Sequence, residues 1–266
     1  MAQPRSPHNG FHYEFNTYKL LRDIGIAFST PSRNQSDTPD IKIKTIPDKT
    51  GQNVAGCELK MNPTTAGSLV LKYSQGWYYG FCDDPRKNLL MAMGETKNLL
   101  HEMNSGLWNG LVPHLQYNES GKKTFVNCAT KMEGYTLDMI KFGGKNEIHF
   151  EIETKLISEY YQHLGCSYFN IGTHGIYLVN GLDPLGLNDK IDGLKIPNFE
   201  DCAKAKLRVR CQYKNKGDYQ FCLSMEFNKL VASPYNLSPI KRGSVKIDKK
   251  KLFSDQNLKL LDAFTK

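Results

Sequence analysis

The chain has 266 residues, enough for one large domain or two small ones with a buried core that needs no cross-links. Hydrophobic residues make up 39% and charged residues 23%, which excludes collagen-like, mucin-like and wholly disordered proteins. The longest apolar stretches fall far short of the roughly 20 residues needed to cross a bilayer, and residues 1–10 lack the apolar segment of a secretory signal. We therefore expect a soluble, cytoplasmic protein with no membrane partner.

The first hundred residues predict a helix, four strands and a second helix. Hydrophobic residues at three- and four-residue steps predict an N-terminal helix over 11–28. Alternating or β-branched runs bounded by turn residues predict the four strands, and their simplest assembly is an antiparallel meander. These strands are expected at 41–46, 54–61, 68–73 and 76–82. Asp84 and Pro85 then begin a long amphipathic helix, because aspartate at the cap and proline in the first turn favour helix initiation.

The remainder of the chain continues the alternation of helices and strands. A helix is predicted over 151–164, followed by strands at 166–171 and 175–179. No internal repeat and no low-complexity linker interrupts the pattern. We therefore predict one domain over residues 1–266 of mixed α/β class, with an α+β mixed sheet flanked by helices.

The cysteines give no sign of a disulfide framework or a zinc ribbon. There are seven, an odd number, and no two form a Cys-x-x-Cys pair. Several have apolar or aromatic neighbours, so we interpret them as small buried hydrophobic residues. The P-loop motif Gly-x-x-x-x-Gly-Lys-Ser/Thr is absent as well, which argues against an ATPase of that class.

The positive charge of the chain is concentrated in its last quarter. The net charge is +8, yet residues 1–200 hold 20 basic and 21 acidic residues, whereas residues 201–266 hold 15 basic and 6 acidic ones. One basic stretch in this quarter lies near the end of the chain, at residues 241–251. It is open to two interpretations: a phosphate-binding loop or a solvated tail. The distribution predicts a polyanion-binding surface within residues 165–266.

The residues from 204 to 211 alternate in polarity, and this pattern predicts how their basic side chains are arranged on the surface. Basic residues alternate there with small or apolar ones, so on a β-strand all the cations share one face, about 6.5–7 Å apart. This spacing is comparable to that of phosphates along a nucleic-acid strand. The residues expected to hold phosphates are Lys204, Lys206, Arg208 and Arg210.

An acidic residue followed two positions later by lysine is the core of one common metal-nuclease site. The tripeptide occurs five times, close to the chance frequency, so only its context is informative. Two instances fall in predicted helices, where the lysine points away from the carboxylate, and another lies in the basic tail. Glu58 and Lys60 lie on a predicted strand, where residues i and i+2 face the same side. We therefore select this pair.

Two aspartates are candidates for a second carboxylate beside Glu58. Asp48, preceded by Pro47, ends the preceding strand beside a glycine-bearing turn, and a single hairpin places it next to Glu58. Asp40 also follows a proline, with seventeen residues between it and Glu58. We prefer Asp48. Two carboxylates with an ammonium suit Mg²⁺, which takes oxygen ligands and retains waters, and Lys60 can orient or deprotonate the attacking water.

Pro47-Asp48, nine intervening residues and Glu58-Leu59-Lys60 resemble the catalytic signature of the PD-(D/E)xK nuclease superfamily. The short spacing and the Glu-Leu-Lys ending resemble certain type II restriction endonucleases. The resemblance covers residues 10–105 and implies a restriction-endonuclease-like core and a Mg²⁺-dependent, site-specific nuclease of double-stranded DNA, usually a homodimer. It also implies that Asp48 and Glu58 are metal ligands, that the Leu59 carbonyl is a further ligand and that Lys60 acts on the attacking water.

Other features leave further functions open. His174, in a glycine-flanked loop, is expected to reach a phosphate or a base edge. The main alternative is a non-enzymatic nucleic-acid-binding or viral structural protein, in which the basic strand binds a polyanion and the pair of Glu58 and Lys60 is incidental. A nuclease-like fold with an inactive site is a third interpretation.

Overall fold

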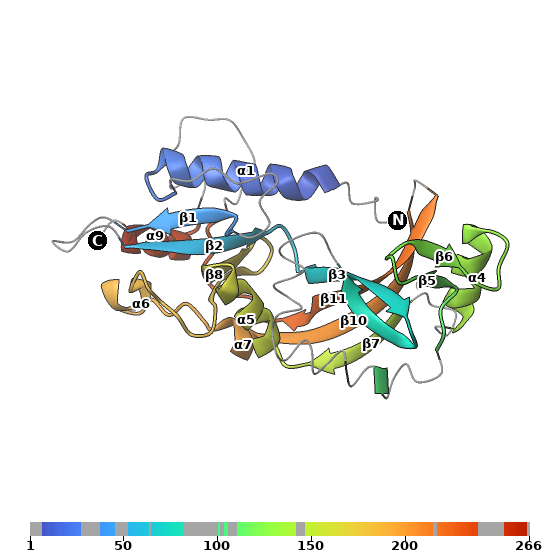
Figure 1. Cartoon of the computed structure of the whole chain (residues 1–266). Coiled ribbons are helices and arrows are strands. Elements are labelled where there is room, and N and C mark those ends of the chain that lie inside the picture. The colour runs from blue at the N-terminus through green and yellow to red at the C-terminus, as the bar shows by residue number, and fades with distance from the viewer. Residues whose placement is uncertain are drawn as a thin grey trace. The chain divides into compact units, whose positions relative to one another are not determined.

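The computed structural model of the chain combines helices with several antiparallel sheets, compatible with the predicted α+β class (Figure 1). It describes residues 7–27, 38–45, 53–63, 65–81, 101, 104–105, 111–141, 147–214, 217–238 and 253–264. The helices are α1 (Pro7–Asp23), α4 (Lys131–Lys141), α5 (Lys155–His163), α6 (Leu187–Lys190), α7 (Phe199–Cys202) and α9 (Asp255–Ala263). Among the described residues, no helix is long and apolar enough to cross a membrane.

The strands form two larger sheets and one small one. One sheet has the order β1-β2-β8-β9, another the order β4-β3-β11-β10-β7, and β5 pairs with β6. The strands are β1 (Ile41–Lys44), β2 (Val54–Lys60), β3 (Thr65–Ser74), β4 (Trp77–Phe81), β5 (Leu115–Tyr117), β6 (Lys123–Phe125), β7 (Glu147–Ile152), β8 (Cys166–Ile171), β9 (Gly175–Leu178), β10 (Ala203–Lys214) and β11 (Asp218–Leu230).

The chain divides into two compact units, each assembled from segments that are distant in sequence. The first unit comprises residues 1–64, 161–204 and 229–266, and the second comprises residues 65–160 and 205–228. The single domain predicted over residues 1–266 stays a prediction.

In the first unit, β2 lies between two partners of opposite direction. It pairs antiparallel with β1, with Ile41 opposite Cys57, and parallel with β8, with Leu59 opposite Asn170. All but its end residues are buried, which is typical of a strand covered on both faces. The parallel connection from β2 to β8 passes through α5.

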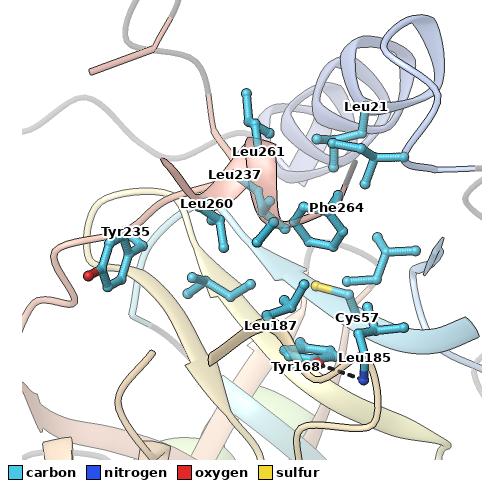
Figure 2. Packing of buried hydrophobic residues seen from close by; sticks show 14 of the residues in the cluster. Leu21, Cys57, Tyr168, Leu185, Leu187, Tyr235, Leu237, Leu260, Leu261 and Phe264 are labelled. Carbon is cyan, nitrogen blue, oxygen red and sulfur yellow. Dashed lines mark hydrogen bonds between the residues drawn. The ribbon is translucent and has the colours of Figure 1, made fainter. Parts of the chain in front are cut away.

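A hydrophobic core lies against one face of this sheet. Figure 2 shows part of it, where Leu21 of α1 and Leu261 and Phe264 at the end of the chain pack near Cys57. Leu59 belongs to the same core. Because side chains alternate along a strand, Glu58 and Lys60 project from the opposite face.

In the second unit, β10 has the predicted alternation. Ala205, Leu207, Val209 and Cys211 are each at most 1% exposed, whereas the basic residues between them are partly accessible to solvent. On β11, Phe221 and Leu223 lie on the buried face, opposite Leu71 and Leu69 of β3. The sheet therefore has one apolar face and one polar face.

Two predictions of local structure require correction. The four strands at 41–82 exist, but they do not form one meander, because β1 and β2 belong to one sheet and β3 and β4 to another. The buried β2 takes β8 as its second partner instead of β3. The helix predicted over 151–164 begins only at Lys155, because Glu147–Ile152 alternates and pairs with β10.

Other predictions are confirmed or fall outside the described residues. The strands at 166–171 and 175–179 correspond to β8 and β9, and the N-terminal helix corresponds to α1, which begins and ends a few residues earlier than predicted. Most of the helix predicted from Asp84 and the whole basic stretch 241–251 lie outside the part of the chain that the structure describes.

Gly56 is where β2 shifts register against β8, and we expect Gly56→Ala to destabilise the protein strongly. A Cβ there would lie 2.1 Å from the Gly165 carbonyl oxygen and 2.4 Å from Pro39 Cγ, so the backbone would have to move. The expected cost is about 3 kcal/mol, seen as a fall of roughly 10 °C in Tm. Thermal unfolding followed by circular dichroism measures it.

Gly10→Ala in α1 is the matched control. A Cβ at Gly10 meets nothing within 4 Å, so alanine should leave Tm unchanged or raise it, consistent with its helix propensity advantage of about 0.5–1 kcal/mol. A Gly56→Ala protein as stable as the parent would show that the close approach of β2 to Gly165 is not a feature of the native state.

Candidate active site

Glu58 and Lys60 form an ion pair on one face of β2. Lys60 Nζ lies 2.6 Å from Glu58 Oε1, and Glu58 is only 6% exposed. Their spacing of two residues places both side chains on the same face of the strand. Lys60 Nζ also lies 5.9 Å from the centroid of the Tyr161 ring, within the range of a cation–π interaction. The pair is therefore held in a largely desolvated position.

Asp40 joins this pair from the start of β1. The backbone N–H of Leu59, between Glu58 and Lys60, donates to Asp40 Oδ2 at 2.9 Å. Asp48 lies outside the described residues. Among the described residues, Asp40 is therefore the aspartate that lies beside Glu58 and Lys60, and the preference for Asp48 stays a prediction.

Glu14 of α1 adds a third carboxylate, which sequence analysis missed. Its charge interacts with those of Lys60 and Glu58. Its single sequence signal is an acidic residue within a run of aromatic side chains, His12, Tyr13 and Phe15. A pattern so short does not indicate that the helix face approaches β2.

Burial and mutual repulsion dominate the electrostatics of the site. Burial raises the pKa of Asp40 well above its usual range, and the charge of Glu58 raises it further, against the opposing ammonium of Lys60. Burial also raises the pKa of Glu14, where Lys60 again opposes and Glu58 adds to the rise. The positive charge of Lys60 therefore does not offset the effects of burial and repulsion on the carboxyl groups of Asp40 and Glu14.

Burial acts to lower the pKa of Lys60, but the neighbouring charges outweigh it. The carboxylate of Glu58 contributes most, and the pKa of Lys60 is held well above its usual value. The ammonium therefore carries its proton throughout the neutral pH range. In this arrangement Lys60 is a hydrogen-bond donor and a positive charge.

The donor set fits a hard divalent cation. The charge of Glu58 repels those of Asp40 and Glu14, whose pKa values are raised, and a bound cation would relieve this repulsion. In the described part of the chain, no three His, Cys, Asp or Glu side chains converge closely enough to form a metal site by themselves. Mg²⁺ is commonly bound by one or two carboxylates while waters fill the remaining positions. Asp40 and Glu58, with the Leu59 carbonyl, meet that requirement.

The site lies toward the ends of two parallel strands. β2 ends at Lys60, whose carbonyl accepts a hydrogen bond of 2.7 Å from the N–H of Gly172, immediately after β8. The carboxyl ends of neighbouring parallel strands are a frequent location for binding sites. Gly172 also begins the loop that carries His174.

His174 is fixed by local hydrogen bonds. Its Nδ1 lies 2.8 Å from Thr173 Oγ1, its N–H donates to Ile171, and its carbonyl accepts from the hydroxyl of Tyr177. The side chain is partly accessible to solvent. Its contact with a phosphate or a base edge stays a prediction.

The predicted phosphate-binding cations on β10 are largely paired with carboxylates of neighbouring strands. Arg208 lies 2.6 Å from Glu226 of β11 and 3.6 Å from Glu147 of β7, and Lys206 lies 3.9 Å from Glu226. Lys206 Nζ also lies 2.8 Å from His149 Nδ1. The centre of this face is therefore close to neutral, a result that the charge of β10 alone did not predict.

The ends of the row differ from its centre. Lys204 is exposed. Arg210 lies opposite Glu147 in the pairing of β10 with β7, and its buried Nε has no hydrogen-bond partner among the described residues. The role of all four cations in holding phosphates stays a prediction.

Comparisons of the chain with protein-family models, with curated proteins and with solved structures found no match. The proposed function therefore rests on the geometry of the site and on the sequence pattern.

Proposed function

We propose that the protein is a Mg²⁺-dependent, site-specific endonuclease of double-stranded DNA, of the type II restriction kind, with a PD-(D/E)xK-like core. The observation that carries this proposal is the hydrogen bond from the N–H of Leu59 to Asp40, beside the ion pair of Lys60 with Glu58. It joins a Pro-Asp dipeptide to a Glu-Leu-Lys tripeptide, the two halves of the superfamily signature.

The order of elements supports the proposal in part. An N-terminal helix contributes Glu14, Asp40 precedes β1, and β2 carries Glu58 and Lys60. The resemblance implies a helix before the strands and a strand that bears the glutamate and lysine, but it implies an aspartate after the first strand, where Asp48 lies in the sequence, and not before it. A buried central strand holds the pair rigidly, as catalytic geometry requires.

Asp40 and Glu58 would hold Mg²⁺ through their carboxylate oxygens, with the Leu59 carbonyl as an additional ligand. The ion would supply charge stabilisation at the scissile phosphate and lower the pKa of a water molecule. Lys60 carries its proton at neutral pH, so its contribution is to orient the attacking water and to stabilise the negative charge that develops on the phosphate. This favours electrostatic action over proton abstraction by Lys60.

Double-stranded DNA is the proposed substrate, and a homodimer is the proposed assembly, because cutting both strands at one site usually requires two active sites. Lys204 and the cations of β10 are proposed to contact phosphates, which would make binding fall steeply as salt is raised. Because Lys206 and Arg208 are partly paired with carboxylates, we expect DNA binding to depend less steeply on salt concentration than it would with four unpaired cations.

Incubation of the purified protein with plasmid DNA, in Mg²⁺ and in EDTA, tests the proposal. We expect discrete fragments in Mg²⁺ and intact plasmid in EDTA. Plasmid that stays intact across several divalent metals, while DNA binding is retained, would support the non-enzymatic nucleic-acid-binding alternative instead.

A further inference from the structure

The strands β10 and β11 form a long two-stranded ribbon whose connecting end extends past its neighbours (Figure 1, orange). Among the described residues, the pairing of β10 with β7 stops at Arg210, and that of β11 with β3 starts only at Phe221. A turn in which Gly217 N–H donates to the Lys214 carbonyl at 3.0 Å joins the two strands. We call residues 211–214 and 217–220 the ribbon end.

The back face of the ribbon end is packed against aromatic side chains of the second unit. Tyr213 lies 5.6 Å from Tyr135 between ring centroids, and Tyr219 lies 5.5 Å from Phe125. The hydroxyl of Tyr219 donates to Asp138, which is fully buried, at 3.2 Å. The ribbon end is thus supported from behind, so the side chains on its front face project from a rigid backbone.

The front face presents hydrogen-bonding groups that have few internal partners. Gln212 and Lys214 of β10 and Gln220 of β11 line an open pocket of about 330 Å³, together with Arg208 of β10 and Ser68 of β3. Within the described residues, no hydrogen bond or ion pair engages the side chain of Gln212 or Lys214. In the part of the chain that the structure describes, Gln220 donates to the sulfur of Cys222 at 3.1 Å, and sulfur is a weak acceptor.

Charge along this face changes from the centre to the ribbon end. At the centre, Glu226 and Glu147 offset the charge of Arg208, which weakens a phosphate contact there. At the ribbon end, the amides of Gln212 and Gln220 line the same pocket as Lys214, and the carboxylate of Asp218 is paired with Lys123. Neutral amides can donate to phosphates as well, but they donate and accept at once, which also suits them to the paired donors and acceptors of base edges. The chemistry of the ribbon end suits base edges.

We propose that the ribbon end reads base edges in the major groove of duplex DNA, with Gln212 and Gln220 as the specificity-determining residues. The inference rests on the proposed function and names where its sequence specificity arises. The major groove of B-DNA admits a two-stranded β-ribbon, and a glutamine amide matches the N6 and N7 atoms of adenine. The major groove of duplex RNA is too narrow for such an element. Lys214 is positioned to contact a guanine or a nearby phosphate.

Selection from a randomised DNA duplex library tests this inference. The protein carries Lys60→Ala so that bound DNA is not cut, and it is compared with the same chain carrying Gln212→Ala, Gln220→Ala or, as the control, Lys204→Ala. We expect the parent to enrich a motif that contains adenine, and each glutamine variant to lose preference at one position. Affinity for the selected duplex should fall about 5- to 100-fold, with an unchanged salt slope.

The control and a modified base separate base reading from general binding. Lys204→Ala should keep the motif and lower affinity for all duplexes alike, with a shallower salt slope. Replacing the selected adenine by 7-deazaadenine should weaken the parent but not the matching glutamine variant. Duplex RNA of the same sequence should bind far more weakly than DNA.

A motif left unchanged by both glutamine substitutions, in variants whose thermal unfolding matches the parent, would overturn the inference while the nuclease proposal stands. An unsubstituted protein that cuts plasmid in Mg²⁺, but whose Lys60→Ala form enriches no motif, would also overturn it. A chain that neither binds duplex DNA nor cuts it would overturn the proposed function itself.

Discussion

Lys60→Ala is expected to lower Mg²⁺-dependent cleavage of plasmid DNA by about a thousandfold and to leave DNA binding within a few-fold of the parent. The ammonium of Lys60 is the positive charge beside Glu58 and Asp40, and its raised pKa keeps it charged at neutral pH. Its removal takes away the donor that we propose orients water and stabilises charge on the phosphate. Fragment formation over time, measured on gels, and duplex binding, measured by fluorescence anisotropy, test the two halves of this expectation.

Lys259→Ala is the matched control for this substitution. Lys259 lies on α9, whose Leu260 and Leu261 belong to the core on the opposite face of the sheet, and it is exposed. Its removal should change cleavage by no more than about twofold, as expected for a surface substitution away from the site. Cleavage by Lys60→Ala at a rate close to the parent's would contradict the assignment of Lys60.

Loss of Lys60 also leaves Glu58 buried without its partner, and breaking a buried pair in this way costs about 3–5 kcal/mol. A double variant, Glu58→Gln with Lys60→Met, removes both charges and avoids that penalty. It should unfold at a temperature closer to the parent's and remain inactive. Inactivity of a stable double variant then reports on chemistry, not on folding.

Asp40→Asn is expected to stabilise the protein in EDTA and to reduce Mg²⁺-dependent cleavage by a hundredfold or more. Asparagine still accepts the N–H of Leu59 through its amide oxygen but carries no charge beside Glu58. Relief of the buried, repelled charge should stabilise by about 1 kcal/mol, seen as a rise of about 2–4 °C in Tm. The same substitution removes a proposed metal ligand, so Mg²⁺ should raise the Tm of the parent and not that of the variant.

The stability difference should depend on pH with a definite sign. Burial and Glu58 raise the folded-state pKa of Asp40, so the folded protein binds this proton more tightly than the unfolded chain. Stability contributed by the protonated form is therefore present below the ordinary carboxyl pKa of about 3.9 and is lost as pH rises toward the raised folded value. In EDTA, the Tm advantage of Asp40→Asn should grow as pH is raised from 4 and then level off.

Asp48→Asn is the comparison that decides between the two aspartates. If Asp40 is the second carboxylate, Asp48→Asn should cleave within about threefold of the parent and show no pH-dependent gain in Tm, as for a surface substitution. The opposite result, with Asp48→Asn inactive and Asp40→Asn active, would restore the hairpin interpretation of the sequence.

Local sequence pattern predicted much of the site because the relevant geometry is local. Glu58 and Lys60 share a face of β2 through the two-residue period of a strand, and that period needs no information from elsewhere in the chain. The same reasoning placed β8, β9 and the alternating β10, whose apolar residues are buried as expected.

Contacts between distant segments were beyond such reasoning. The sequence placed Asp48 beside Glu58 through a short hairpin, which stays a prediction, but it did not show that Asp40 accepts a hydrogen bond from Leu59 next to the pairing of β1 with β2. Glu14 approaches from a helix more than forty residues away in sequence. No periodicity within α1 indicates which neighbour its acidic side chain meets.

The sequence by itself determined the strands β1 to β4, β8 and β9, the buried face of β10 and the shared face of Glu58 and Lys60, because alternation and turn residues act over a few positions. The tertiary structure alone decided that β2 pairs with β8 instead of β3, and that Glu147 and Glu226 neutralise the centre of β10. Strand order and cross-strand charge depend on which distant segments the folded chain brings together. The free energy of each pairing depends on both segments, so neither segment by itself specifies its partner.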